Sequence, residues 1–293
     1  MRNLFSELSF TTDGHFKIMN TETENIEIML LLEAIYQKYG YDFRDYSRAS
    51  IKRRIKHTLS MSGLDNISEM VRQVLYDERF FNRLLMNFSI NVTEMFRDPP
   101  FYKALSQTVI KELKQKAFVR IWHAGCATGE EAYSMAILLK EAGLYDRSRI
   151  YATDFNEEVI RKAREGIYPL NDIIKYGQNY SQSTGNENFS KYYTSRYDYA
   201  IIDRSLRKNI IFSDYNLVTD HVFCEMDLIV CRNVLIYFNR TLQNRVLNLF
   251  IESLAPKGYM CLGLQESTKF TDYANNFIEI ARKEKIYQKV EPQ

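Results

Sequence analysis

The sequence predicts an all-helical domain followed by an α/β domain with a mainly parallel sheet. The apolar period is helical up to about residue 116, and short β-branched runs then alternate with helical patterns. A length of 293 residues exceeds one average domain and falls short of three. With 45% hydrophobic and 26% charged residues, the chain contains enough apolar material to bury a sizeable core.

Four amphipathic helices are expected in the first region. Residues 1–23 are polar and aperiodic, so we expect a loosely held arm there. The stripes that follow recur at helical spacing, and Gly40 ends the first helix. Their members are Ile28, Leu31, Leu32, Ile35 and Tyr39, then Ile51, Ile55 and Leu59, then Met70, Val71 and Val74, and last Phe81, Leu84, Leu85 and Phe88. We therefore place the helical domain at residues 24–98.

The α/β domain is placed at residues 99–293. Strands are expected at 118–122, 149–153, 228–231 and 259–262, with helices at 132–139, 159–163 and 242–250. Near-continuous apolar strands that alternate with helices indicate a parallel sheet covered on both faces. We expect residues 277–280 and 285–290 to close the sheet as an antiparallel pair.

An insertion rich in Tyr, Asn, Ser and Gln is expected at about residues 169–213. Two of its apolar runs, 199–202 and 209–212, are separated by a short polar segment. We expect these two runs to pair as a β-hairpin.

The charge balance and the scarcity of metal ligands narrow the functional classes. Lys and Arg number 39 against 37 Asp and Glu, which is far from the basic balance of a protein whose whole surface binds nucleic acid. The four Cys and four His residues form no ligand cluster, so we expect no metal and a reducing cytoplasm. The longest apolar run contains Glu27 and Glu33, so we expect no insertion into a membrane.

A glycine turn between the first strand and its helix is the first candidate site. Gly125 and Gly129 bracket the turn, and Glu130 and Glu131 follow. The spacing is neither GxGxxG nor a P-loop, and carboxylates repel phosphate. A cationic ligand such as S-adenosylmethionine (SAM), with its sulfonium and ammonium groups, fits better. The alternative is a purely structural tight turn, in which the two glutamates interact favourably with the positive end of the helix dipole.

The ends of two later strands supply further candidates. Asp154 ends the second strand, where an acidic side chain accepts both ribose hydroxyls in nucleoside-binding α/β folds. Its alternative role is the N-cap of the next helix. Arg232, Asn233 and Tyr237 follow the strand at 228–231 and face the expected ligand crevice, although Tyr237 fits a core position equally well.

Two segments outside the strand ends carry weaker signals. Asp98-Pro99-Pro100-Phe101 is similar to the loop of amino-group methyltransferases that act on nucleic acid bases, but two prolines favour the start of a helix. Arg48, Lys52 and Lys56 recur every four residues beside Arg53 and Arg54. This basic stripe either docks an acidic partner or is a solvated helix face.

Several runs together resemble the chemotaxis receptor glutamate methyltransferases, the CheR family. They are Ile121–Ser134, Ala152–Asp154, Ala163–Tyr168, Asn216–Leu217 and Cys231–Phe238. The resemblance implies a helical domain, then a Rossmann-like SAM-dependent methyltransferase domain with a small β-subdomain. It also implies transfer of the SAM methyl group to glutamates in the cytoplasmic helical domain of a methyl-accepting chemoreceptor. S-adenosylhomocysteine would be the product, and the enzyme would be a monomer.

The resemblance also implies roles for individual residues. Glu131 would bind the methionine part of SAM, Asp154 would hold the ribose, and Asn216 and Leu217 would flank the adenine. Arg97 and Tyr237 would be catalytic, lying nearest the methyl group. The expected cofactor-binding set is Asn91, Thr93, Arg97, Gly125, Gly129, Glu131, Asp154, Asn216, Leu217, Arg232 and Asn233. The expected docking set is Arg48, Lys52, Arg53 and Lys56.

Two features of the sequence depart from the family pattern, and two other functions compete with the one that the resemblance implies. The family's proline after the paired glutamates is Ala132 here. Some members tether to a receptor tail through a glycine-containing loop of the β-subdomain, and the loop expected to correspond, residues 203–208, has no glycine. We therefore expect no such tether. The rival functions are a non-catalytic SAM-binding adaptor and a nucleic acid base methyltransferase.

Overall fold

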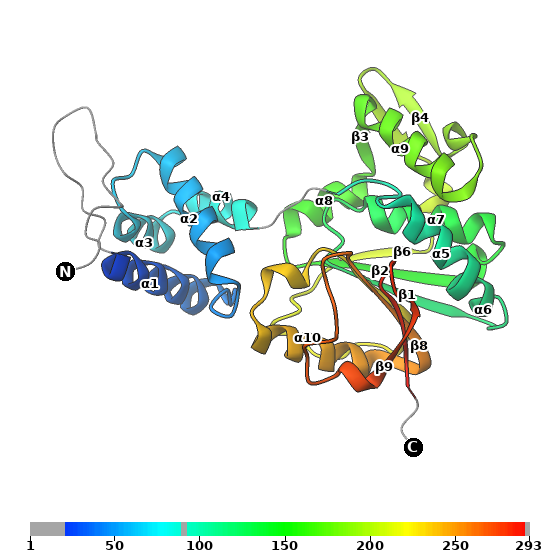
Figure 1. Cartoon of the computed structure of the whole chain (residues 1–293). Helices are drawn as coiled ribbons and strands as arrows, with labels where there is room; N and C mark the ends of the chain where they lie inside the picture. Colours follow the sequence, from blue (N-terminus) through cyan, green and yellow to red (C-terminus); the bar gives the residue numbers. More distant parts are fainter. Residues whose placement is uncertain (1–20, 89–92, 291–293) are drawn as a thin grey trace, which may run out of the picture. The chain divides into compact units, whose positions relative to one another are not determined.

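The computed structural model describes residues 21–88 and 93–290. The chain divides into two compact units, Met1–Phe88 and Ser89–Gln293 (Figure 1). The segment before Pro99, which the sequence assigned to the helical domain, thus belongs to the α/β unit. The expected arm lies outside the described residues except for its last three, with which the first helix begins.

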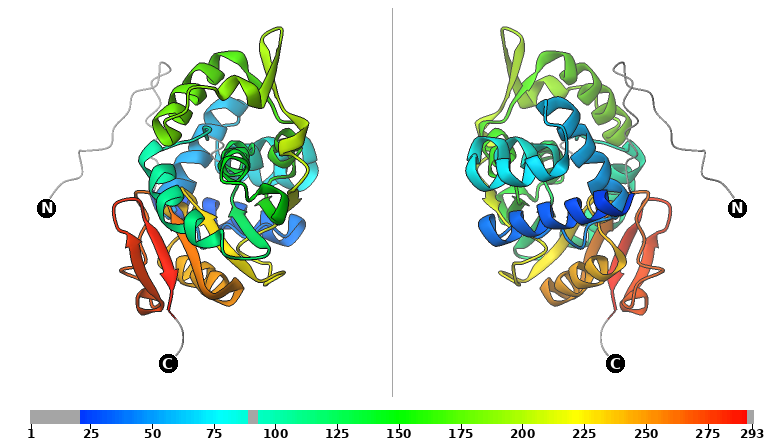
Figure 2. Two further views of the ribbon diagram at one scale, coloured as in Figure 1. Left: turned by 90° about the vertical axis from the view of Figure 1, so that its right-hand side faces the viewer. Right: turned by 90° about the vertical axis from the view of Figure 1, so that its left-hand side faces the viewer.

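The first unit consists of the four helices that the apolar stripes predicted. They are α1 (Thr21–Tyr39), α2 (Arg48–Ser62), α3 (Ile67–Tyr76) and α4 (Glu78–Phe88). Helix α1 packs on α3 and α2 packs on α4, as Figure 2 shows in blue and cyan. Leu31, Ile35, Ile55 and Leu84 are completely buried, so the predicted stripes form the core of this unit.

The second unit is built on a seven-stranded sheet. Its strands are β1 (Val119–Ala124), β2 (Ser148–Asp154), β6 (Ile210–Asp214), β7 (Met226–Cys231), β8 (Leu254–Leu262), β9 (Phe277–Ala281) and β10 (Ile286–Lys289). Their order is β6-β2-β1-β7-β8-β10-β9, parallel from β6 to β8, with β10 antiparallel to both neighbours. The expected closing pair is confirmed. The chain order reverses between β1 and β7, which is where open α/β sheets bind ligands.

Helices cover both faces of this sheet, as the strand pattern predicted. In Figure 1, α7 (Glu130–Glu141) lies above the sheet and α10 (Arg240–Ser253) below it. Trp122 of β1 meets Phe250 of α10 edge to face at 5.4 Å, while Tyr133 of α7 lies 5.7 Å from Phe212 of β6. Helix α8 (Glu157–Glu165) also packs on the parallel strands, at β2 and β6.

The insertion forms a separate three-stranded antiparallel sheet. It contains β3 (Ile167–Pro169), α9 (Leu170–Thr184), β4 (Tyr193–Arg196) and β5 (Tyr199–Ile202), in the strand order β3-β5-β4. The predicted hairpin between 199–202 and 209–212 is wrong. The first run pairs with β4 and β3, whereas the second belongs to β6 and pairs with β2 in parallel. Both runs are apolar, and apolar content alone does not choose a strand's partner.

The hairpin turn of the insertion therefore lies at Tyr197 and Asp198, with Tyr197 in the left-handed region at φ 52°. This turn, like residues 203–208, has no glycine. The absence of a tether to a receptor tail stays a prediction. Short helical segments complete the unit: α5 (Pro99–Leu105), η1 (Ser106–Ile110), α6 (Lys111–Leu113), η2 (Tyr145–Arg147), η3 (Phe189–Tyr192), η4 (Arg204–Leu206), η5 (Leu235–Tyr237) and η6 (Ala274–Asn276). Within residues 21–88 and 93–290, none of the helices combines the length and apolarity needed to cross a bilayer.

Candidate functional site

The glycine turn after β1 has the backbone shape that only glycines allow. Gly125 and Gly129 have φ values of 79° and 93°. A Cβ atom on Gly125 would lie 2.4 Å from Val234 Cγ2, and one on Gly129 would lie 2.9 Å from Ala163 Cβ. Both glycines are therefore required by the turn and by its packing, and the turn touches the segment that follows β7.

Asp154 ends β2 beside this turn. Its Oδ2 accepts a hydrogen bond from the Ala127 N–H at 3.0 Å, and its Oδ1 accepts one from the Asn156 N–H at 3.1 Å. Burial raises the pKa of Asp154 to about 6, although the backbone N–H groups oppose this. The N-cap of α8 is Asn156, whose side chain accepts from the Glu158 N–H. The alternative role of Asp154 as a helix cap is therefore wrong.

The segment after β6 lies next to Asp154. The Tyr215 N–H donates to the Asp154 carbonyl at 3.0 Å, and Asn216 and Leu217 follow directly. Leu217 is buried, and the Asn216 side chain accepts from the Val218 N–H. The structure thus brings the residues expected to flank an adenine to the strand end expected to hold a ribose.

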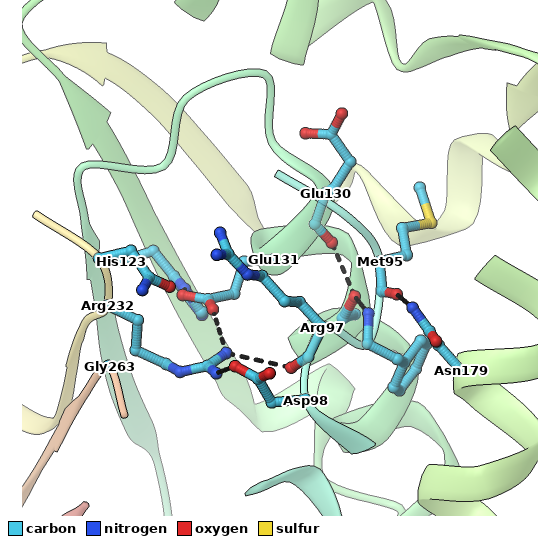
Figure 3. Close-up of polar contacts among 12 residues, drawn as sticks. Met95, Arg97, Asp98, His123, Glu130, Glu131, Asn179, Arg232 and Gly263 are labelled. Carbon is cyan, nitrogen blue, oxygen red and sulfur yellow. Dashed lines mark hydrogen bonds and ion pairs between the residues drawn. The ribbon is translucent and has the colours of Figure 1, made fainter. Parts of the chain in front are cut away.

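A buried ionic cluster lies between the ends of β1 and β7 (Figure 3). Arg232 binds Glu131 Oε2 with Nη1 at 2.7 Å and Asp98 Oδ2 with Nη2 at 2.5 Å. The His123 Nδ1 atom lies 3.3 Å from Glu131 Oε1. Burial raises the pKa of Glu131, but Arg232 and His123 outweigh burial and hold that pKa below its ordinary value. Glu131 is therefore an anion at neutral pH.

The two neighbouring glutamates have different surroundings. Figure 3 shows the Glu130 side chain directed away from Glu131 and Arg232. Its two carboxylate oxygens accept from the Thr128 hydroxyl at 2.9 and 2.7 Å. Burial raises the pKa of Glu130 to about 7. Of the two glutamates, Glu131 thus belongs to the ionic cluster and Glu130 does not.

The segment that carries Arg97 is held in a strained conformation. Phe96 and Asp98, on either side of Arg97, have left-handed φ values of 53° and 61°. The Phe96 N–H donates to Ser134 Oγ at 2.8 Å, and the Arg97 carbonyl accepts from Arg232 Nη1 at 3.3 Å. The Met95 carbonyl accepts from Asn179 of α9 at 3.1 Å (Figure 3). The backbone of Arg97 is therefore fixed from three elements.

The other predicted site residues are placed as follows. Thr93 is half-buried at the start of the Arg97 segment, and Asn91 lies outside the described residues. Asn233 and Tyr237 follow β7, Asn233 with a left-handed φ of 62° and Tyr237 at the end of η5. Helix α5 begins at Pro99, so the prolines mark a helix start and not the end of a buried strand.

Sequence reasoning missed three residues that build this edge. Asp98 was noted only as part of the proline motif and His123 only within the glycine run, yet both contact the Arg232–Glu131 pair. Glu266 was not considered at all. It is an acidic residue four positions beyond β8, and only the parallel alignment of β7 and β8 brings it to the site.

The basic stripe of α2 is partly neutralised within its own unit. Lys52 and Lys56 contact the two carboxylate oxygens of Glu24 at 2.8 and 2.9 Å. Arg48 and Arg53 are exposed. Of the four expected docking cations, Lys52 and Lys56 thus pair with Glu24, whereas Arg48 and Arg53 face solvent.

The residues at this edge fit SAM. Asp154 is a buried carboxylate at a strand end, Glu131 is an anion suited to the cationic amino-acid part, and the glycine turn lies at the reversal of strand order. A Rossmann-like sheet with an acidic strand end is the arrangement expected of a protein that binds a nucleoside-containing cofactor such as SAM. Within the part of the chain that the structure describes, no three His, Cys, Asp or Glu side chains gather as metal ligands.

Comparison with known proteins identifies the family. Residues 91–284 match the family described as CheR methyltransferase, SAM binding domain, and residues 26–89 match CheR methyltransferase, all-alpha domain. The chain belongs to the CheR methyltransferase family. A Pseudomonas putida protein named as a methyltransferase, Cher3, is 48% identical, covering 90% of this chain and 97% of its own.

Two relatives are named chemotaxis protein methyltransferases. The Borreliella burgdorferi protein is 29% identical, covering 86% of this chain and 91% of its own. The Salmonella typhimurium protein is 28% identical, covering 81% of this chain and 82% of its own.

Proposed function

We propose that this protein transfers the methyl group of SAM to glutamate side chains of a methyl-accepting chemoreceptor, forming methyl esters in sensory adaptation. The observation that carries the proposal is the rigid Arg97 segment beside the Glu131–Arg232 pair. This segment carries the cationic side chain of Arg97 at a site that fits SAM. The names of the Borreliella burgdorferi and Salmonella typhimurium relatives support the chemotaxis substrate.

SAM, when bound, supplies an electrophilic methyl group on a positively charged sulfur. Asp154 would accept the ribose hydroxyls, Asn216 and Leu217 would flank the adenine, and Glu131 would bind the cationic amino-acid part. Arg232 is already bonded to Glu131 and Asp98, so its part is to hold Glu131 in place. Asn233 and Thr93 would complete the site, with the glycine turn beneath them.

The glutamate substrate needs no general base to become a nucleophile. A glutamate carboxylate has a reference pKa of about 4.3, so it is already an anion at neutral pH and no base is needed. Its reaction with a sulfonium annihilates charge, which a water-poor site favours. Arg97 would orient the carboxylate through charge-assisted hydrogen bonds, and Tyr237 would donate a hydrogen bond and exclude water.

The helical unit would recognise the partner. Arg48 and Arg53, with Lys52 and Lys56 beside them, would meet an acidic helical region of the receptor. The protein would act as a monomer in the cytoplasm, where the receptor's signalling domain would lie.

Methyl transfer from radiolabelled SAM tests the proposal. The full chain is incubated with a chemoreceptor cytoplasmic fragment and, separately, with nucleic acid. Label on the receptor that base releases as methanol supports glutamate ester formation. Label on nucleic acid would instead support a base methyltransferase, and SAM binding without any transfer would support an adaptor.

A further inference from the structure

Glu266 is a buried acid that no motif marks. It lies in the loop after β8 and is only 4% exposed. Glutamates are almost never fully buried unless their charge is compensated. The contacts of Glu266 therefore require a reason.

Four backbone N–H groups from two loops converge on this carboxylate. Oε2 accepts from Gly263 at 2.5 Å and from Asn233 at 3.1 Å. Oε1 accepts from Val234 at 2.9 Å and from Ile236 at 3.3 Å. Burial raises the pKa of Glu266, and the four N–H groups oppose that rise. One side chain thus satisfies donors in the loops after both β7 and β8.

The loop after β7 depends on these bonds for its shape. Asn233 has a left-handed φ of 62°, a conformation that is uncommon outside glycine but that asparagine adopts more readily than most residues. The Val234 carbonyl accepts from the Tyr237 N–H at 3.1 Å, so two hydrogen bonds link the Glu266 carboxylate to the Tyr237 backbone. Val234 also packs where a Cβ on Gly125 would lie.

Gly263 shows how closely the two loops approach each other. A Cβ on Gly263 would lie 2.8 Å from both the Asn233 N atom and Glu266 Oε2. No side chain is therefore accommodated between the two loops at position 263.

We propose that Glu266 is a positioning residue of the methyl-transfer site. It holds residues 232–237, through their backbone, in the conformation that presents Asn233 to SAM and Tyr237 to the transferring methyl group, without itself contacting SAM. This inference rests on the proposed function for the role of Tyr237 and on the family's SAM site for the role of Asn233.

Glu266→Gln is the first variant. A carboxamide offers one oxygen acceptor, while its NH₂ group opposes the N–H donors on the other side. Misplacement of the loop is expected to raise the Kd for S-adenosylhomocysteine about ten- to a hundredfold. Hydrogen exchange of the Asn233, Val234 and Ile236 amides should accelerate. Glu266→Asp keeps a carboxylate on a shorter stem and should recover part of the affinity.

Asp227→Asn is the matched control. Asp227 is buried on the same strand, β7, but at its opposite end, where it accepts from the Arg120 N–H at 2.8 Å and pairs with Lys116 Nζ at 2.5 Å. This variant is expected to lose stability with an unchanged Kd for S-adenosylhomocysteine. Its amide exchange should accelerate near Arg120 and not at residues 233–236.

Calorimetric titration of the full-length variants with S-adenosylhomocysteine decides the matter. Wild-type affinity in folded Glu266→Gln, or an equal loss in Asp227→Asn, overturns the positioning role. If Glu266→Gln does not fold, the same readouts on Glu266→Asp apply, and wild-type affinity with faster exchange at residues 233–236 overturns it. No receptor is present, so a failure of receptor methylation leaves this test intact.

Discussion

At the scale of single residues, the proposed ribose contact of Asp154 predicts that ligand binding depends on pH. Burial raises the pKa of Asp154 to about 6, and the proposed contact to both ribose hydroxyls requires the ionised form. S-adenosylhomocysteine affinity should therefore rise as pH increases through about 6, and fall up to tenfold per unit below it. Asp154→Asn should bind weakly, with a flatter profile. Calorimetric titrations between pH 5 and 8 measure this.

Tyr237→Phe is the contrasting variant for that experiment. It removes a hydroxyl assigned to the methyl-transfer step and should lower turnover with little change in affinity. If Asp154→Asn binds S-adenosylhomocysteine as tightly as the wild type does, the ribose assignment is lost.

Glu130 affects stability rather than ligand binding. Its pKa is raised from 4.5 to about 7 in the folded chain. A raised pKa contributes stability that is complete below about 4.5 and is lost as pH rises through about 7. Glu130→Gln lacks this loss, so its stability advantage should grow by about 2 to 3 kcal/mol between pH 5 and 8.

Urea unfolding of the wild type and Glu130→Gln at both pH values provides the measurement. Glu157→Gln, which changes an exposed glutamate, is the control and should show no such trend. An advantage that does not change with pH would mean that folding does not raise the pKa of Glu130.

At the scale of elements, α2 shows how an internal ion pair divides a charged stripe. Glu24 of α1 already pairs with Lys52 and Lys56 and offsets part of their charge, whereas Arg53 is exposed. Arg53→Glu should therefore slow receptor methylation about tenfold at low salt, with a smaller effect at high salt. Affinity for S-adenosylhomocysteine should not change.

Arg72→Glu supplies the comparison, because Arg72 is an exposed cation on α3 outside the stripe. Initial methylation rates at two ionic strengths distinguish the two positions. Equal slowing by both variants would point to net charge rather than to a defined docking face.

The insertion shows that strand content can be predicted while strand pairing cannot. Residues 199–202 and 209–212 are equally apolar, yet they join different sheets. Ile210 and Phe212 are buried beside β2, and Ala200 and Ile202 are buried in the small sheet. Periodicity predicted that both are strands. The partner of each depends on which surface the folded chain leaves open.

At the scale of the whole molecule, the small sheet bears on how the receptor is held. Some family members bind a receptor tail through a glycine-containing loop of this subdomain. The hairpin turn at Tyr197 and Asp198 has no such glycine. A receptor with its C-terminal tail removed should thus be methylated as fast as the intact receptor. Methylation rates of the two receptors check this, and a severalfold slower rate without the tail would show a tether.

The sequence by itself determined the helices of the first unit, the parallel strands, the closing antiparallel pair and the family. Local patterns suffice for these, because spacing along the chain reports which face is buried and motifs are contiguous. Glu131 and Asp154 were predicted from their positions at a helix start and a strand end, and Arg97 from the family resemblance.

Only the tertiary structure decided how these residues act together. The different surroundings of Glu130 and Glu131, the pairing of Glu24 with Lys52 and Lys56, and the four hydrogen bonds to Glu266 all depend on contacts that spacing along the chain does not encode. Arg232 is the clearest case, because its partners Asp98 and Glu131 lie more than one hundred positions away along the chain. Such contacts arise only when strand order and loop packing bring distant segments together.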